Sequence, residues 1–284
     1  MIKVFIVMAS LVGLLFYFLG GSDTTNNRND KSAIPTGLQK LASLPASITE
    51  SSGVEVLSKK GNYITHNDAG NSPQLFYINE KGDIVETHKL NIPNVDWEDL
   101  SKDDDDNLYI ADTGNNNNRR KELAIYKVSL DDMNEVAAIR YTYEDQKSFP
   151  PAKKDMNFDS EAFFWYDSQL YIITKDRGQK RTAKVYRLSD EPGTYKAELV
   201  GSTRFNGQVT SAAISPDGKL VVLLEEGRIH LYRNFEEPAS FYEGKSEEIE
   251  LTGAGQTEAV AFEDNHSLII TSEGGSLYRL KLAE

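Results

Sequence analysis

The chain has 284 residues, with 31 basic and 44 acidic side chains and a formal net charge of −13. This length fits one large all-β domain or two ordinary domains. A chain this acidic repels phosphate backbones, so its composition argues against nucleic-acid binding. Cysteine is absent, which excludes disulfides, zinc–thiolate sites, thiol catalysis and a lipid-modified N-terminal cysteine.

Residues 1–22 are predicted to deliver the chain across a membrane. Lys3 precedes an apolar run over residues 4–19, which is longer than a minimal signal-peptide core and slightly short for a bilayer-spanning helix. Small residues permit cleavage before Asp23, although no A-x-A-like triplet is present. A cleaved signal peptide and an uncleaved membrane anchor are the two main alternatives, with a buried core helix as a third. Both main alternatives place the rest of the chain outside the cytoplasm, either periplasmic or secreted.

Residues 23–36 are polar, with several Asn and Asp residues and one proline, and are predicted to form a flexible linker. From there on the sequence repeats itself. Five units share one plan: VEVLSKKGNYITHNDAG, WEDLSKDDDDNLYIADTG, SEAFFWYDSQLYIITKDRG, SAAISPDGKLVVLLEEG and TEAVAFEDNHSLIITSEGG.

Each unit begins with a short strand and a polar turn, followed by an apolar strand, an aromatic-containing strand and a more polar strand. Four short strands repeated at near-regular spacing are typical of propeller blades. We therefore predict that residues 37–284 form an all-β propeller of five blades, with six as the alternative. The last unit contains only three strands, so we expect residues 37–50 to supply its fourth strand and to close the ring.

The second unit resembles an NHL-type propeller repeat, because LYIADT over residues 108–113 and Arg119 match the hallmark of that repeat. With WED, DSEA and QTEA at the unit openings, the chain from about residue 37 resembles the SdiA-regulated group of bacterial propellers. That resemblance implies a five-bladed, calcium-binding fold with no established activity. It also implies a distant relation to the NHL, gluconolactonase, paraoxonase and strictosidine-synthase propellers.

In the folds that the chain resembles, the first strand of each blade is innermost and its start points towards the central channel. Four of the five openings carry glutamate, and the fifth carries Ser211. The four are Glu55, Glu98, Glu161 and Glu258. Carboxylates gathered around one channel mouth must protonate, pair with cations or bind a metal.

We therefore predict that Glu98, Glu161 and Glu258, with Glu55 as a fourth ligand, hold a divalent cation. Oxygen ligands without cysteine select a hard ion, and long side chains suit Ca²⁺ better than Mg²⁺. Asp112 and Asn67, at the ends of apolar strands, are expected to complete or orient the ligand shell. The alternative is that the glutamates cap backbone amides of the blades.

Three functions are compatible with the sequence. The first is a binding or scaffold propeller with Ca²⁺ in its channel and an unidentified ligand or protein at the channel mouth. The second is a calcium-dependent hydrolase of lactones or phosphoesters, for which His66, beside Asn67 at a strand end, is the candidate general base. The third is a metal-free structural propeller. Neither a G-x-S-x-G elbow nor a P-loop is present, and we favour the first function.

Overall fold

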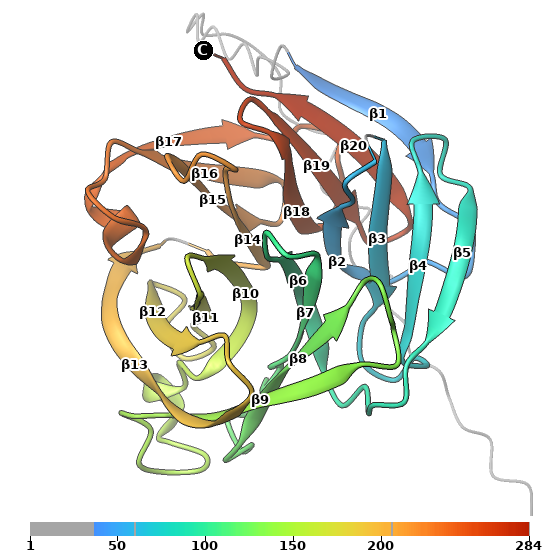
Figure 1. The fold of residues 1–284 in the computed structure, drawn as a ribbon. Coiled ribbons are helices and arrows are strands. Elements are labelled where there is room, and N and C mark those ends of the chain that lie inside the picture. Colours follow the sequence, from blue (N-terminus) through green and yellow to red (C-terminus); the bar gives the residue numbers. More distant parts are fainter. Residues whose placement is uncertain (1–36, 60, 206, 284) are drawn as a thin grey trace, which may run out of the picture. The chain divides into compact units, whose positions relative to one another are not determined.

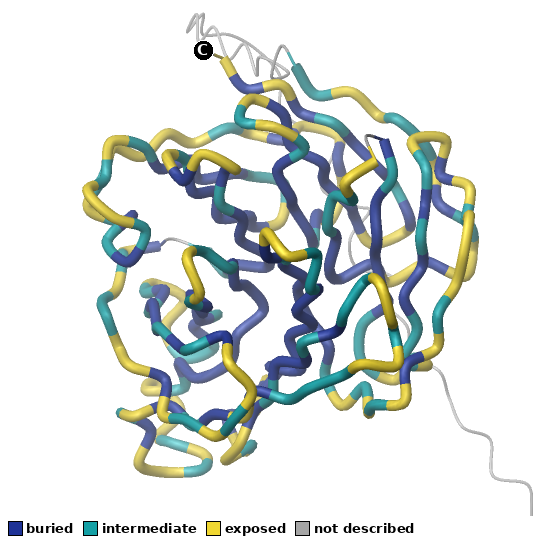
Figure 2. Tube along the Cα trace, viewed as in Figure 1, coloured by how far each residue is buried: buried dark blue, intermediate teal, exposed yellow. Residues whose placement is uncertain are grey.

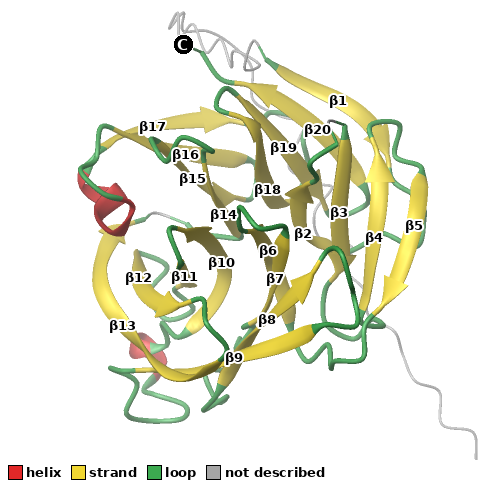
Figure 3. Ribbon diagram, in the orientation of Figure 1, coloured by secondary structure: helices red, strands yellow, loops and turns green. Residues whose placement is uncertain are grey.

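The computed structural model describes residues 37–59, 61–205 and 207–283. The N-terminal apolar run and the linker fall outside these ranges. Within the described ranges, no helix has the length and apolar character needed to cross a bilayer. These ranges contain twenty strands and two short 3₁₀ helices, η1 (Lys153–Asp155) and η2 (Pro238–Glu243), and Figure 3 shows how completely strands dominate. The described part of the chain is therefore all-β, as the sequence predicts.

The strands form antiparallel units of four; four of the units consist of consecutive strands, and the fifth combines β18–β20 with β1. The first unit contains β2 (Ser51–Val56), β3 (Asn62–Asn67), β4 (Gln74–Asn79) and β5 (Ile84–Lys89). The second contains β6 (Trp97–Lys102), β7 (Asn107–Asp112), β8 (Leu123–Ser129) and β9 (Val136–Tyr143). The third contains β10 (Asp159–Tyr166), β11 (Gln169–Lys175), β12 (Thr182–Ser189) and β13 (Gly193–Arg204). The fourth contains β14 (Ser211–Ile214), β15 (Leu220–Glu225), β16 (Arg228–Arg233) and β17 (Lys245–Glu250). The fifth contains β18 (Thr257–Asp264), β19 (Ser267–Ser272), β20 (Ser276–Lys281) and β1 (Leu38–Ser43).

The second and third units are joined into one eight-stranded sheet, because their outer strands β9 and β13 pair in parallel. The innermost strands form a ring around the axis that is visible in Figure 1. In this ring β2 contacts β6, β6 contacts β10, β10 contacts β14, β14 contacts β18, and β18 contacts β2. Four-stranded meanders arranged around a common axis define a propeller, and the predicted all-β propeller architecture is confirmed.

The ring is closed by the start of the described chain. Strand β1 pairs antiparallel with β20, from Leu38 opposite Leu280 to Ser43 opposite Ser276. The prediction that residues 37–50 supply the outer strand of the last unit is therefore confirmed. The pairing covers the edge of β20, which would otherwise expose unpaired backbone groups.

Burial falls from the axis outwards, as Figure 2 shows. Strands such as β3 and β19 are buried almost throughout, whereas β5 and β17 are largely exposed and charged. Apolar side chains fill the spaces between neighbouring units; between the second and third units, for example, Tyr109, Tyr141 and Phe163 share one cluster. The apolar segments of the sequence form strands because each one can bury its side chains against neighbouring units on both faces of its sheet.

The middle of the channel is occupied by Asp99 of β6, whose side chain has no solvent exposure. Its Oδ2 accepts hydrogen bonds from the Ser211 hydroxyl at 3.0 Å and the Ala212 N–H at 3.1 Å. The Phe163 N–H lies 3.4 Å from the same oxygen. The Ser211 hydroxyl in turn accepts the Val260 N–H at 3.0 Å. The inner strands β6, β10, β14 and β18 are thus tied together by one carboxylate and one hydroxyl.

We predict that Asp99→Ala lowers the free energy of unfolding by about 2–5 kcal/mol, because it leaves the buried Ala212 and Phe163 N–H groups without their acceptor. Urea unfolding measures this loss. The control is Asp131→Ala, at an exposed position, for which we expect a change within about 0.5 kcal/mol. Equal stability of the two variants would show that the Asp99 hydrogen bonds contribute nothing net.

Candidate metal centre at one mouth of the channel

Three of the predicted glutamates lie at the same end of the inner strands. Glu98, Glu161 and Glu258 are the second, third and second residues of β6, β10 and β18. Each lies where the pairing with the neighbouring strand shifts its register. A β-bulge inserts an extra residue and re-aims its side chain. The bulges therefore place these glutamates at the channel mouth instead of in the regular in–out alternation of a strand.

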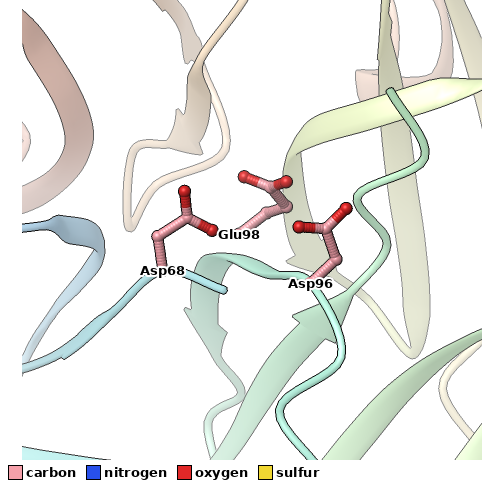
Figure 4. Close-up of side chains that lie close together, drawn as sticks. All are labelled: Asp68, Asp96 and Glu98. Carbon is pink, nitrogen blue, oxygen red and sulfur yellow. The ribbon is translucent and has the colours of Figure 1, made fainter. Parts of the chain in front are cut away.

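Glu98 forms the centre of an acidic cluster with Asp68 and Asp96. Asp68 directly follows β3 and Asp96 directly precedes β6. The three residues each offer a carboxylate oxygen, and these oxygens lie within 4.8 Å of one another. Figure 4 shows the carboxylates converging from the two neighbouring units. Glu98 is buried, and the two aspartates are half-buried. We call Asp68, Asp96 and Glu98 the carboxylate cluster.

The carboxylate cluster lacks the basic partners that its neighbours have. Glu161 forms ion pairs with Lys175 and Arg177. Within the described ranges, Asp68, Asp96 and Glu98 form no ion pair with any basic side chain. Like charges about 4 Å apart repel by roughly 4 kcal/mol at an effective dielectric constant near 20. The cluster therefore needs protons or a bound cation to be stable.

The pKa values of the cluster reflect this need. Burial, followed by the charges of Glu161 and Asp68, raises the pKa of Glu98 well above its ordinary value. Burial and neighbouring carboxylates raise the pKa of Asp96 to about 6. Burial also raises the pKa of Asp68. At neutral pH a bound cation would compete with protons for these oxygens.

The backbone around the cluster leaves room for it. A Cβ atom on Gly114 would lie 2.3 Å from both Asp96 Oδ2 and Glu98 Oε1, so only glycine fits beside the two carboxylates. Asp112 lies behind them. Its Oδ1 accepts the Asp96 N–H at 3.2 Å and an Arg120 N–H at 2.8 Å. Asp112 thus orients the loop that carries Asp96.

Asn67 is the last residue of β3 and directly precedes Asp68. Its side chain donates to the Ser47 carbonyl at 2.7 Å and accepts the Glu50 N–H at 3.3 Å. These bonds fasten the segment between β1 and β2 to the end of β3. Glu258 is at the same mouth and accepts a hydrogen bond from Gln256 at 2.8 Å. Burial raises the pKa of Glu258, and the nearby charges of Lys175 and Asp68 also act on this carboxyl. Glu258 therefore lies near the carboxylate cluster without belonging to it.

Glu55 does not join the other glutamates. It is the fifth of six residues in β2 and pairs with Ile64, so it lies near the opposite end of its strand. It lines a separate cavity together with Lys102. The position in β2 that corresponds to the other glutamates is Ser52, at the bulge between Ser51 and Gly53. The expected convergence of Glu55 is therefore wrong, because the VEV and WED segments look alike but differ in register.

His66 is not at the channel mouth. Its side chain is fully buried and packs edge-on against Trp97, with ring centroids 5.4 Å apart. Nδ1 lies 3.0 Å from the Asn67 carbonyl oxygen, and Nε2 has no hydrogen-bond partner among the described residues. Burial lowers the pKa of His66 to about 4. A general base must reach a proton of its substrate, and this imidazole is enclosed by the blade.

Two residues of the carboxylate cluster were not among the predicted ligands. Asp68 was visible as a polar residue at a strand end, and Asp96 stands two residues before Glu98 in the segment DWED. Regular strand alternation gives no reason to choose between these carboxylates. Both aspartates lie in segments that flank the strands, and they meet only because neighbouring units pack together.

No protein-family model matches the sequence, and no curated protein sequence matches it. Solved structures do resemble the fold. A PQQ-bound aldose sugar dehydrogenase from Streptomyces coelicolor matches with a TM-score of 0.49 at 9% identity, over 86% of this chain and 97% of that one. A virginiamycin B lyase from Staphylococcus aureus matches with a TM-score of 0.41 at 13% identity, over 84% of this chain and 69% of that one. The WD40 propeller domain of Doa1 matches with a TM-score of 0.42 at 14% identity, over 87% of this chain and 69% of that one.

We predict that chelator-treated protein becomes more stable as the pH falls from 8 to 5.5. The folded-state pKa values of Asp96 and Glu98 lie above their unfolded values. Their contribution to the free energy of unfolding is therefore fully present below their unfolded-state pKa of about 4. It is lost as the pH rises through the folded-state pKa, which is about 6 for Asp96. The melting temperature measured across this range should change less in Asp96→Asn/Glu98→Gln than in the unmodified protein.

The control for this pH series is Asp131→Asn/Glu135→Gln, which removes the same two charges at exposed positions. Its pH profile should match that of the unmodified protein. Parallel profiles for all three proteins would contradict the assignment.

Proposed function

We propose that this chain is an extracytoplasmic propeller of five blades that acts as a binding module and holds Ca²⁺ at the carboxylate cluster. The observation that carries the proposal is the meeting of Asp68, Asp96 and Glu98 without a basic partner in the described part of the chain. Such a cluster is unstable alone and becomes favourable around a cation.

Each four-stranded unit corresponds to one blade in this proposal. The eight-stranded sheet then consists of two blades whose outer strands β9 and β13 pair. The order of contacts among the inner strands supports this count. We further propose that the chain belongs with the NHL-like, SdiA-regulated type of propeller. Residues 108–112 of the matching motif lie in β7, which ends in Asp112, and Asp112 orients the loop that carries Asp96.

The chemistry of the ligands favours Ca²⁺. The cluster offers only oxygen atoms, and hard oxygen ligands select Ca²⁺ or Mg²⁺ over transition metals. Ca²⁺ accepts six to eight oxygens in a flexible arrangement, whereas Mg²⁺ demands a near-ideal octahedron. The cluster combines two aspartates from loops with a longer glutamate from a bulged strand. This irregular arrangement suits Ca²⁺ better than Mg²⁺. Gly114 provides the space beside them.

A binding role is favoured over hydrolysis. A metal-dependent hydrolase needs a base beside the ion as well as an open coordination position. The proposed base, His66, is buried in the blade. Two further carboxylates at the mouth are Glu161, which is paired with Lys175 and Arg177, and Glu258, which accepts a hydrogen bond from Gln256. The ligand or protein partner is therefore expected to meet the channel mouth through the bound ion and its carboxylate surroundings.

We predict that Ca²⁺ raises the melting temperature of chelator-treated protein and that equimolar Mg²⁺ raises it less. Binding to the folded state at 100 times the dissociation constant adds about 2.7 kcal/mol of stability. Asp96→Asn/Glu98→Gln should weaken Ca²⁺ binding at least tenfold in calorimetric titration. The exposed control Asp131→Asn/Glu135→Gln should bind as the unmodified protein does. A folded protein whose melting temperature ignores both chelator and Ca²⁺ would overturn the proposal.

We also predict that a reporter active only in the cytoplasm is inactive when fused after Glu284. The reason is the apolar run of residues 4–19 behind Lys3, which is expected to direct export. The matched control lacks residues 1–22 and should restore reporter activity. Full activity of the fusion that retains residues 1–22 would contradict the extracytoplasmic location.

A further inference from the structure

The opposite mouth of the channel contains a cavity of about 810 Å³. It is lined by the later residues of the inner strands and the turns that follow them, including Glu55, Lys102 and Trp165. This volume is in the range of small-molecule binding sites. Leu100 and Ala212, which line the cavity, directly follow the buried residues Asp99 and Ser211. The buried layer in the middle of the channel therefore lies between this cavity and the carboxylate cluster.

The lining of the cavity is strongly acidic. It includes seven carboxylate side chains, and Lys102 is the one basic side chain among the described lining residues. Lys102 is itself bonded to Asp106 at 2.9 Å. A concave surface lined by one sign of charge concentrates ligands of the opposite sign. The cavity therefore selects for positive charge.

Some of the lining carboxylates already have hydrogen-bond or ion-pair partners within the protein. Asp103 accepts hydrogen bonds from Asn107 and Tyr109, and Glu263 pairs with Arg279. Others have no basic partner in the described ranges; these are Glu55, Asp104, Asp105 and Asp167.

Glu55 is the innermost of these four, because it lies on a strand whereas the other three lie in turns. Its Oε1 accepts the Val56 N–H at 2.7 Å, and the nearby Lys102 ammonium is bonded to Asp106 at 2.9 Å. Burial raises the pKa of Glu55 to about 7. A carboxylate in this situation gains from a cation that enters the cavity.

The spacing of the carboxylates favours an extended ligand over a metal ion. Among the described residues, the one group of three or more acidic side chains with oxygens within 4.8 Å is the carboxylate cluster at the other mouth. No three of the described cavity carboxylates therefore lie close enough together to surround one ion. Trp165 and Tyr166 are half-buried in the same lining. Aromatic side chains attract organic cations through their ring faces and pack against alkyl chains.

We infer that this cavity binds a small organic amine carrying more than one positive charge, of the diamine or polyamine class. One ammonium group pairs with Glu55, and a second lies near the rim carboxylates Asp104, Asp105 and Asp167. The connecting alkyl chain packs beside Trp165 and Tyr166. The inference does not depend on the Ca²⁺ proposal, because the two sites occupy opposite mouths of the channel.

Calorimetric titration of the full chain with spermidine, putrescine and methylamine at constant ionic strength tests the inference. We expect saturable one-to-one binding of spermidine, weaker binding of putrescine and at least tenfold weaker binding of methylamine. Glu55→Gln should weaken spermidine binding at least tenfold. The matched control Glu135→Gln removes the same charge at an exposed position and should leave binding unchanged.

Two further variants keep the test decisive. Asp104→Asn/Asp105→Asn changes exposed turn residues and should weaken spermidine binding without lowering the melting temperature, even if Glu55→Gln fails to fold. Asp96→Asn/Glu98→Gln should lose Ca²⁺ binding and keep spermidine binding. The inference is overturned if no amine gives saturable binding, or if both cavity variants bind spermidine as tightly as the Glu135→Gln control.

Discussion

Asp99 places a carboxylate at the centre of the ring, where it has no contact with solvent. Removing this group from water is costly, and burial raises its pKa well above the ordinary value. The cost is offset because the same carboxylate accepts N–H and O–H groups of β10 and β14, which would otherwise be unpaired. The inner strands can therefore lie close together without a continuous hydrogen-bonded ladder between units. The same layer closes the channel and gives it two chemically separate mouths.

The architecture could be predicted because it depends on features that repeat. Alternating apolar residues, turn sequences such as SPDG and the missing fourth strand of the last unit all indicated the ring and its closure. Gly218 of that turn has a φ of +69°, a conformation that favours glycine. These signals are local in the sequence and recur in several units, so one misjudged strand does not change the overall result.

The candidate site was predicted only in part because it depends on register. Glu98, Glu161 and Glu258 reach one mouth through bulges, and Glu55, which looks equivalent in sequence, lies at the other end of its strand. A single residue of register decides which face and which end a side chain occupies. Asp68 joins the cluster through contact between neighbouring units. Nothing in a single sequence specifies either the shift or the contact.

The pairing of β1 with β20 also governs the order of events during folding. The two strands are separated by almost the whole propeller sequence, and contacts between distant residues form late because closing a long loop costs entropy. While the chain is being made, β1 has no partner, and the sheet edge it will cover does not yet exist. The ring is thus a structure that the chain completes all at once after β20 is available. Until then the growing chain carries unpaired strand edges that invite aggregation.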